Sequence, residues 1–347
     1  MVYGISIQQA IAKVVGGAHL TRDEAKAAME IIMEGGATQA QIGSLLTALR
    51  MKGETADEIG GFAETMRSKA NAVHSERFNL LDTCGTGGDG ADTFNISTAS
   101  AIVAAAGGIR VAKHGNRAMS SKSGSADVLE ALGVTIGLSA EQASACLERI
   151  GICFMFAQAH HPSMKHAAVP RKEIGIRTVF NLLGPLTNPA GADRQLLGIF
   201  DRNRTELVAE VLGSLGIKRA LVVASYDGLD EISISAATKV TELKDGDVRT
   251  FDIAPDELGL RAYPMSDVVG GDAAANAAII RSVFAGAPGA CRDIILANAG
   301  ACFYVTGRCS TLQEGVKLAG AAIDSGKAAE KLEQLVQVTG ESAHVSR

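Results

Sequence analysis

The sequence predicts an α/β protein: a small all-helical N-terminal domain, then a larger domain with a mainly parallel central sheet flanked by helices. Three observations support this fold class. Helix-start motifs recur through the first 70 residues. From about residue 78, short apolar runs alternate with helical stretches, which is typical of parallel strands covered by helices. The length of 347 residues also suits two domains.

Four capping boxes mark the N-terminal helices, each with a Ser or Thr followed three residues later by Gln or Glu. The pairs are Ser6 and Gln9, Thr21 and Glu24, Thr38 and Gln41, and Thr55 and Glu58. Glycines at 16–17, 35–36 and 53 follow as stop signals, because glycine readily takes the left-handed conformation after a helix. We therefore expect a helical domain over residues 1–72.

The second domain, residues 73–347, is expected to hold buried strands connected by helices. The expected strands are 79–82, 109–112, 134–136, 152–156, 196–200 and 220–224. Intervening helices are expected to begin near Ser97, Ser125, Ser139 and Asn203. Residues 238–243 and 248–253 flank an Asp-Gly turn and predict an antiparallel hairpin, after which 272–338 returns to helices. The irregular segment 170–190 is expected to cross back to the helical domain.

Composition and charge exclude several classes of protein. Hydrophobic residues make up 47% and charged residues 20%, which is typical of a globular chain rather than a disordered one. A net charge of -5 offers no overall basic field to nucleic acid or to an anionic membrane, and neither is expected as a partner. We see no secretory signal, no membrane span and no zinc or disulfide spacing among the six cysteines, so a cytoplasmic location is expected.

The sharpest functional motif is the run DTCGTGGDG at 82–90, which follows an expected strand. Its glycines let backbone amides approach an anion, and the helix that starts near Ser97 adds partial positive charge. A glycine-rich turn without a ligand is about equally common for one short motif. The spacing also matches the dinucleotide fingerprint formally, but the helix starts late and the next strand ends in Lys113-His114 rather than an acidic residue.

A second polar loop follows the next strand, with KHGNR at 113–117 and SSKSGS at 120–125. Ligands of open parallel sheets bind beyond the carboxyl ends of the strands, so this loop should lie beside the glycine-rich run. A solvated basic turn is the usual explanation of an isolated cluster of this kind. Two neighbouring anion-binding loops favour a ligand that carries two phosphate groups.

An acidic turn, Asp227-Gly228-Leu229-Asp230-Glu231, follows the strand expected at 220–224. Adjacent carboxylates repel each other, and a cation between them and a phosphate would relieve that repulsion. Magnesium suits such a site, because it binds one or two carboxylates together with water and phosphate oxygens. Taken by itself, the motif is more often an ordinary Asp-Gly turn with exposed acids.

Together these segments resemble the anthranilate phosphoribosyltransferase family. The matching segments are GTGGD (85–89), NIST (95–98), KHGNR (113–117), SGSAD (123–127), AQAHHP (157–162), Arg171, RTVFNLLGPLTN (177–188), GLDE (228–231), 298–300 and 325–327. The likeness covers essentially the whole chain. It departs at Ala224-Ser225, where the family more often places a His.

The resemblance implies an architecture like that of nucleoside phosphorylases and phosphoribosyltransferases, and a homodimer formed through the N-terminal helices. It also implies transfer of the 5-phosphoribosyl group from 5-phosphoribosyl pyrophosphate (PRPP) to the amine of anthranilate, in tryptophan biosynthesis. Such a displacement at ribose C1 needs no side-chain nucleophile. The protein would position the substrates and stabilise the leaving pyrophosphate through Lys113, bound magnesium and loop amides.

The same resemblance implies the site residues. PRPP would bind at Gly85, Gly88, Asp89, Thr93, Asn95, Ile96, Ser97, Thr98, Lys113, His114, Gly115, Asn116, Arg117, Ala118, Met119, Ser120, Ser121 and Ser125. Anthranilate would bind at Gly85, Asn116 and Arg171, with His114 and His160 lining its access path. Magnesium, as two ions with PRPP bound, would be held by Ser97, Asp230 and Glu231.

Two alternatives belong to other functional classes. A pyrimidine nucleoside phosphorylase resembles this architecture and has Lys-His-Gly and Ser-Gly-x-x-Asp elements, but it uses inorganic phosphate and needs no paired acidic turn. Asp230, Glu231 and Arg171 argue against it. A nucleic-acid-binding relative that has lost catalysis should show a basic groove and strong salt dependence, and the acidic net charge argues against that.

Overall fold

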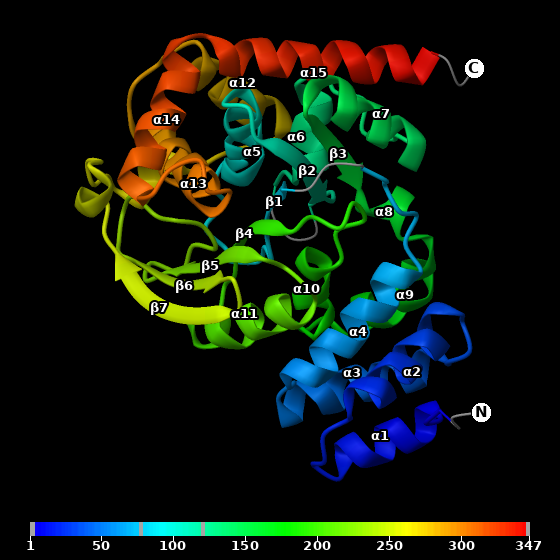
Figure 1. The fold of residues 1–347 in the computed structure, drawn as a ribbon. Coiled ribbons are helices and arrows are strands. Elements are labelled where there is room, and N and C mark those ends of the chain that lie inside the picture. The colour runs from blue at the N-terminus through cyan, green and yellow to red at the C-terminus, as the bar shows by residue number, and fades with distance from the viewer. Residues whose placement is uncertain (1–3, 76–78, 119–121, 345–347) are drawn as a thin grey trace.

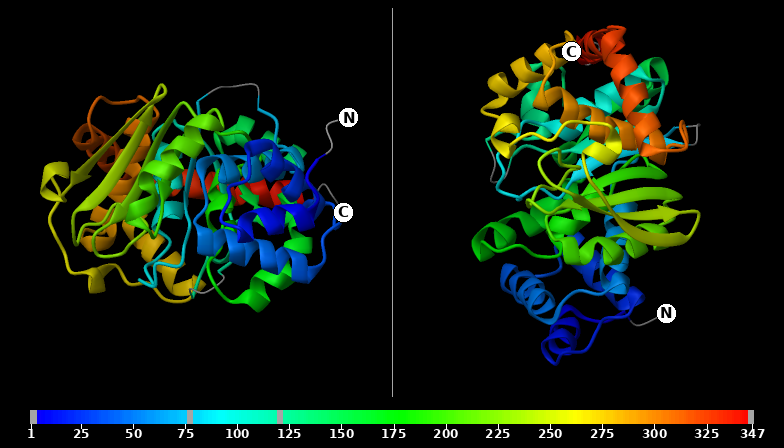
Figure 2. Two further views of the ribbon diagram at one scale, coloured as in Figure 1. Left: turned by 90° about the horizontal axis from the view of Figure 1, so that it is seen from below. Right: turned by 90° about the vertical axis from the view of Figure 1, so that its left-hand side faces the viewer.

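The computed structural model describes residues 4–75, 79–118 and 122–344. The molecule is elongated, with the N-terminal helices at one end, the C-terminal helices at the other and the sheet between them (Figures 1 and 2). Among the described helices, none combines the length and the apolarity that crossing a membrane requires.

The N-terminal part consists of α1 (Ile7–Val15), α2 (Arg22–Met33), α3 (Gln39–Lys52) and α4 (Ala56–Ser68). All four begin with the predicted capping box, and both reciprocal hydrogen bonds are present in each. Gly17, Gly35 and Gly53 have φ angles of 81°, 76° and 87°, so the predicted stop signals use the conformation that glycine permits. The helical start of the chain is confirmed.

The central sheet has seven strands in the order β3-β2-β1-β4-β5-β6-β7. Their bounds are β1 (Leu80–Gly85), β2 (Arg110–Gly115), β3 (Ile152–Phe156), β4 (Arg194–Gly198), β5 (Arg219–Ser225), β6 (Thr238–Lys244) and β7 (Asp247–Ile253). The first five are parallel, and β6 and β7 form the predicted antiparallel hairpin through Asp245-Gly246. The predicted mainly parallel sheet is confirmed.

The strand predicted at 134–136 is wrong. Val134 and Ile136 are buried, but the segment forms no strand. The backbone N–H of Thr135 donates to the hydroxyl of Thr339 at 3.1 Å, on the C-terminal helix α15 (Lys327–His344). Alternating apolar residues therefore pack here beneath a helix, which supplies the hydrogen-bond partner that a neighbouring strand would otherwise supply.

The remaining helices connect and cover the strands. They are α5 (Ile96–Ala106), α6 (Ser125–Ala131), α7 (Ala140–Ile150), α8 (Ala157–His160), α9 (Lys165–Ile174), α10 (Phe180–Leu183), α11 (Thr205–Ser214), α12 (Ala273–Phe284), α13 (Ala290–Val305) and α14 (Leu312–Asp324). Short 3-10 turns lie at Pro162–Met164, Gly184–Leu186, Arg202–Arg204, Asp256–Leu258 and Met265–Val268. Helix starts predicted near Ser97, Ser125 and Ser139 are confirmed within a residue, and α11 follows the turn at Asn203.

Each face of the sheet packs into its own hydrophobic cluster, because successive residues of a strand point to opposite faces. Leu196 and Leu221 join α5 and α13 on one face. Leu197 and Val222 join α10 and α11 on the other, and this second cluster continues without a break into α1–α4. The N-terminal helices are therefore attached through the sheet's second face.

The segment after β3 packs against the N-terminal helices. Helix α9 packs against α2 and α3, and α10 packs against α4 (Figure 1). The Arg67 guanidinium of α4 reinforces this contact by donating to the carbonyl of Leu186 at 2.7 Å. Residues from this segment can consequently reach the edge of the sheet where the loops after β1 and β2 lie.

Candidate functional site

The site begins with a gap in the sheet between β1 and β2. These two parallel strands pair only at Leu80 with Arg110 and at Leu81 with Val111. Beyond that point β1 continues to pair with β4, and β2 with β3, up to Gly85 and Gly115. The carboxyl halves of β1 and β2 thus separate, and side chains occupy the space between them.

Asp82 and Asn188 supply side-chain hydrogen bonds where the backbone pairing between β1 and β2 is missing. The backbone N–H of His114 donates to Asp82 Oδ1 at 3.1 Å, and Asn188 Nδ2 donates to the carbonyl of Ala112 at 2.8 Å. Both side chains are buried. Burial raises the pKa of the Asp82 carboxyl, an effect that nearby Lys113 opposes. The gap is therefore bridged by side-chain hydrogen bonds rather than left as a packing defect.

Lys113 lies in this gap with its side chain 3% exposed. Its Nζ donates to the carbonyl of Thr83 at 2.5 Å and to the hydroxyl of Ser97 at 3.2 Å. A buried ammonium held in this way keeps a fixed position between β1 and the start of α5. The predicted donor-site residues Lys113 and Ser97 are consequently in direct contact.

The glycine-rich loop after β1 depends on glycine at several positions. Gly87, Gly88 and Gly90 have φ angles of 65°, 77° and 75°, a region that favours glycine. Gly85 is required for a different reason, because a Cβ built there would lie 2.5 Å from Asp230 Oδ2. The loop therefore passes close to the acidic turn.

The acidic turn after β5 meets this loop and the start of α5. Asp230 Oδ2 accepts a hydrogen bond from the Gly87 amide at 2.7 Å, and the Glu231 carboxylate lies close to the Ser97 amide. Burial and the neighbouring Asp89 raise the pKa of Asp230 to about 7. Burial and Asp230 raise the pKa of Glu231 well above its usual range. The structure thus brings the predicted metal ligands Ser97, Asp230 and Glu231 together.

This acid pair fits a divalent cation that also binds substrate. Among the described residues, no group of three or more His, Cys, Asp or Glu side chains is arranged to hold a metal ion by itself. Two buried carboxylates that resist ionisation would be stabilised by a nearby positive ion. Magnesium commonly takes one or two protein carboxylates and completes its shell with water and phosphate oxygens, so the residues present are compatible with it.

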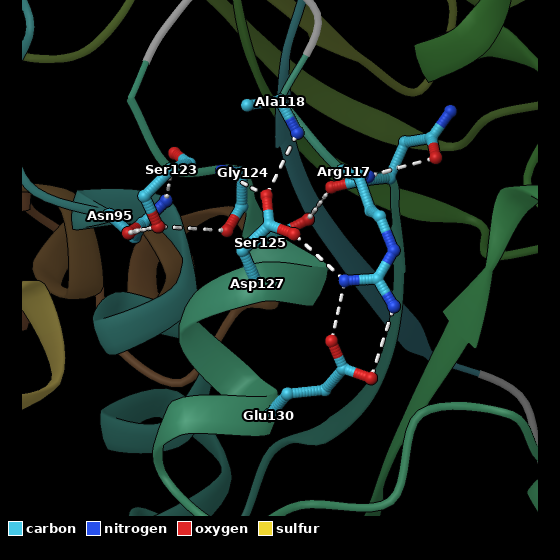
Figure 3. Close-up of polar contacts among 9 residues, drawn as sticks. Asn95, Arg117, Ala118, Ser123, Gly124, Ser125, Asp127 and Glu130 are labelled. Atoms are coloured by element: carbon cyan, nitrogen blue, oxygen red, sulfur yellow. Dashed lines mark hydrogen bonds and ion pairs between the residues drawn. The ribbon is translucent and has the colours of Figure 1, made fainter. Parts of the chain in front are cut away.

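Asn95 ties the end of the glycine-rich loop to the loop after β2 (Figure 3). Its Nδ2 donates to the carbonyl of Ser123 at 3.0 Å, and its Oδ1 accepts from the hydroxyl of Ser123 at 3.3 Å and from Asn276 at 3.0 Å. Asn95 precedes α5 without capping it through its side chain. Ile96 and Thr98 are buried in the first turn of that helix.

Arg117 points toward α6 and is engaged by acids there (Figure 3). One guanidinium nitrogen donates to Asp127 at 2.9 Å, and another donates to Glu130 at 3.0 Å. Asp127 also accepts from the Ala118 amide at 3.0 Å. Asp127 therefore fixes the shape of this loop, and the positive charge of Arg117 is partly neutralised.

The other predicted donor residues occupy the same edge of the sheet. Ser125 Oγ donates to the carbonyl of Asn116 at 3.2 Å, and a Cβ built on Gly115 would overlap that hydroxyl oxygen. Thr93, in the loop before α5, forms an isolated bridge with Val269. The predicted residues Met119, Ser120 and Ser121 lie outside the described residues.

Three buried histidines lie next to this edge. The rings of His114 and His161 are 5.1 Å apart between centroids. His161 Nε2 contacts the carbonyl of Thr187 at 3.0 Å, and His160 Nδ1 contacts that of Asn71 at 3.1 Å, so each of these nitrogens carries the hydrogen. Burial lowers the pKa of His114 to about 3 and of His161 to about 4, and the neighbouring histidines add to both effects. All three rings are therefore neutral near pH 7.

Arg171 lies in the last turn of α9. Its guanidinium lies 5.0 Å from the centroid of the Phe180 ring at the start of α10. It is half-buried, burial lowers its pKa, and no hydrogen bond or ion pair joins it to another described residue. His114 meets the carbonyl of Gly184, just after the same helix, so α10 connects the surroundings of Arg171 and His114.

Asp82, Asn188 and Arg177 make contacts at the site that the sequence did not reveal. Asp82 stands at the head of the glycine-rich motif and Asn188 at the end of the RTVFNLLGPLTN segment, so both were visible without an assigned role. Arg177 opens that segment, and its guanidinium lies 3.9 Å from the centroid of the Phe200 ring and over Gly88. No pattern in the sequence indicates these contacts, because each joins segments far apart along the chain.

Comparison with known proteins agrees with this arrangement. Residues 8–70 match the helical bundle domain of a glycosyl transferase family, and residues 77–329 match the a/b domain of that family. An anthranilate phosphoribosyltransferase of Brevibacillus brevis is 55% identical, over 97% of this chain and 99% of the relative.

Solved structures with this name share the fold. That of the Thermus thermophilus enzyme superposes with a TM-score of 0.91 at 43% identity, covering 95% of this chain and 99% of the other. The Saccharomyces cerevisiae enzyme in complex with PRPP and Mg has a TM-score of 0.88 at 26% identity, covering 96% of this chain and 98% of the other. Because both domain models match and the relatives are matched over nearly their whole length, the chain belongs to the anthranilate phosphoribosyltransferase family.

Proposed function

We propose that this protein transfers the 5-phosphoribosyl group of PRPP to the amine of anthranilate, giving N-(5-phosphoribosyl)anthranilate and pyrophosphate in tryptophan biosynthesis. The observation that carries the proposal is the meeting of the acidic turn with the glycine-rich loop. Asp230 accepts from the Gly87 amide at 2.7 Å, in a chain that shares 55% identity with a relative of this name. A diphosphate and a divalent cation would both find ligands at that point.

The donor half of the site serves mainly to position PRPP and to stabilise its leaving group. Amides of the glycine-rich loop and of the start of α5 can donate to phosphate oxygens, and the Lys113 ammonium lies beside Ser97 at the same helix start. Negative charge grows on the pyrophosphate as its bond to ribose C1 breaks, so fixed donors there lower the barrier. Bound magnesium would supply further positive charge to those oxygens.

We propose two magnesium ions when PRPP is bound, at Ser97, Asp230 and Glu231. The support is that the two carboxylates face different backbone elements: Asp230 meets the glycine-rich loop, and Glu231 meets the start of α5. Because the two carboxylates face different elements, each could hold a cation at its own position.

The acceptor half would be formed by Gly85, Asn116 and Arg171, with His114 and His160 lining the access path. Arg171 offers a planar guanidinium without a carboxylate partner among the described residues, which suits the carboxylate of anthranilate. His114 and His160 leave Nε2 atoms that are buried and lack a hydrogen-bond partner within the same described set. A neutral imidazole nitrogen can accept a hydrogen bond from an aromatic amine.

The remaining features of the proposal concern assembly and location. We propose a homodimer formed through the N-terminal helices, where Val15 and Met51 are 69% and 84% exposed. We divide the chain into a helical domain of residues 1–72, joined by the crossing segment 170–190, and an α/β domain of residues 73–347, because α9 and α10 pack on the N-terminal helices. A cytoplasmic location is in keeping with six cysteines that are all free. Light scattering after size-exclusion chromatography measures the molar mass in solution, and we expect the mass of two chains.

Product analysis tests the activity directly. The purified protein is incubated with PRPP, anthranilate and magnesium, and we expect N-(5-phosphoribosyl)anthranilate by mass spectrometry together with an equal amount of pyrophosphate. A parallel incubation with inorganic phosphate and a pyrimidine nucleoside should release no base. Release of base there, with no product from PRPP, would assign the chain to the nucleoside phosphorylases instead.

A further inference from the structure

We propose that Arg177 is an additional donor-binding residue whose guanidinium binds a phosphate group of PRPP above the glycine-rich loop. The inference rests on the proposed function and adds a residue to its donor site. Arg177 belongs to the segment between α9 and α10, whereas the donor residues implied by the resemblance lie between 85 and 125.

The position of Arg177 is set by an aromatic platform and by the loop itself. The guanidinium carbon lies 3.9 Å from the centroid of the Phe200 ring. A Cβ built on Gly88 would lie 3.0 Å from Nη2 and 3.3 Å from both Cζ and Nε of Arg177. The guanidinium therefore runs alongside the backbone of the loop. Stacking occupies a face of the planar group and leaves its edge, where the N–H donors lie, free to meet an anion.

The platform is joined to the donor loop rather than to the acceptor side. Phe200 follows β4, the strand next to β1, and its backbone N–H donates to Thr86 Oγ1 at 3.3 Å. The Thr86 amide in turn donates to the carbonyl of Gly198 at 2.9 Å. Arg171, by contrast, stacks on Phe180 in α10. The two arginines of one crossing segment thus lie against different platforms, which suits two different substrates.

The pairing of the basic side chains around the loops also favours Arg177 as a phosphate-binding residue. Arg117 is engaged by Asp127 and Glu130, and Lys122 pairs with Asp92 at 3.7 Å. Within residues 4–75, 79–118 and 122–344, no hydrogen bond or ion pair engages Arg177, and the residue is exposed apart from its contact with the Phe200 ring. PRPP carries several negative charges and would bring them beside Asp89, Asp230 and Glu231. An unpaired guanidinium at the rim can offset that repulsion through charge-assisted hydrogen bonds.

The test is steady-state kinetics with each substrate varied in turn, on the parent and on Arg177→Gln, Arg177→Lys and Phe200→Leu. We expect Arg177→Gln to raise the PRPP KM by about tenfold or more, the loss typical of one charge-assisted hydrogen bond. The anthranilate KM should change by less than about twofold. Arg177→Lys should recover part of the loss, because it keeps the charge but not the fork. Phe200→Leu should give a smaller increase, because it removes only the platform.

Calorimetric titration with PRPP and magnesium should rank the variants in the same order without any turnover. The matched control is Arg219→Gln. The Arg219 guanidinium carbon also lies over an aromatic ring, 5.5 Å from the centroid of Tyr304, but Arg219 is at the start of β5, at the opposite end of the parallel strands from the loops. That variant should keep parental PRPP binding. Parental PRPP affinity in Arg177→Gln, or an increase confined to the anthranilate KM, overturns the inference. A parent that neither binds PRPP nor forms product overturns the proposed function instead.

Discussion

Arg171 combines a half-buried guanidinium, an aromatic neighbour and no anionic partner among the described residues. We predict that Arg171→Ala chiefly raises the anthranilate KM and leaves PRPP binding nearly unchanged, because the residue would meet the substrate carboxylate. Arg171→Lys should recover only part of the loss, since an ammonium cannot form two parallel hydrogen bonds. A surface ion pair would contribute at most about 1 kcal/mol and nothing to catalysis. If Arg171→Ala keeps the parental anthranilate KM and kcat, Arg171 is a surface residue that does not bind the substrate.

His161 makes the stability of the fold depend on pH. Because its pKa is about 4 in the folded chain and near 6.5 when exposed, its contribution is complete above pH ~6.5 and is lost as the pH falls toward 4. This one group should remove about 2 kcal/mol of unfolding free energy between pH 7.5 and pH 5. His161→Gln keeps a donor for the Thr187 carbonyl but does not titrate.

Urea unfolding of the parent and of His161→Gln at pH 7.5 and pH 5 measures this effect. The variant should lose less stability on acidification than the parent by about that amount. His74→Gln, at an exposed histidine, serves as the control and should behave like the parent. Equal acid sensitivity in the parent and His161→Gln would show that the buried ring is not the source.

At the residue scale, the sequence predicted which residues would lie together but not the directions in which their side chains point. Ser97, Asp230 and Glu231 were expected to share a metal site, and the three residues lie close together, because strand ends and helix starts meet at one edge of a parallel sheet. Arg117 follows β2 as expected, yet its guanidinium turns toward Glu130. The contact of Arg177 with Gly88 depends on how a distant segment returns to the sheet, which local sequence does not specify.

At the scale of elements, β4 and the acidic turn are packed backbone to backbone. A Cβ built on Gly198 would overlap the carbonyl oxygen of Asp230, so one of the two segments would have to move. We predict that Gly198→Ala lowers kcat by about tenfold or more, because misplaced ligands weaken transition-state stabilisation. The same variant should require more magnesium for half-maximal activity.

Gly137→Ala is the matched control for this substitution. A Cβ at Gly137 would meet no atom within 4 Å, and its φ is not in the left-handed region. Activity and magnesium dependence should therefore stay at parental values, with stability unchanged or raised by up to about 1 kcal/mol. If both alanine variants retain parental kcat, the close approach of β4 to the acidic turn does not matter for turnover.

Elements with local signals were the most predictable. The four capping boxes each involve residues three apart, and all four helices begin where predicted. The segment 134–136 shows the limit of such local signals. Its alternating apolar residues did not reveal that its hydrogen-bond partner is Thr339 on a helix. The gap between β1 and β2 was equally hidden, because the Asp82 and Asn188 side chains that bridge it come from separate strands and loops.

At the scale of the whole molecule, strand–helix alternation was enough to predict a parallel sheet covered on both faces. It did not predict that one hydrophobic cluster would run from α1 through α11 to the sheet. That continuity arises from the segment after β3, which packs α9 and α10 on the N-terminal helices. The crossing segment also carries Arg171 and Arg177, so the same stretch of chain attaches the helical part and supplies the two arginines that we propose as substrate-binding residues.

The most direct test of the central claim follows the fluorescence of anthranilate after mixing with the protein, PRPP and magnesium. We predict a steady loss of fluorescence that requires all four components, because the amine of the fluorophore becomes substituted. The variant carrying Asp230→Asn and Glu231→Gln should fold but react far more slowly at saturating magnesium, since pyrophosphate would leave without its counter-charge. No loss of fluorescence with the parent protein, in an assay that works with a known enzyme, would contradict the account, and parental rates in the double variant would contradict the role of the acidic turn.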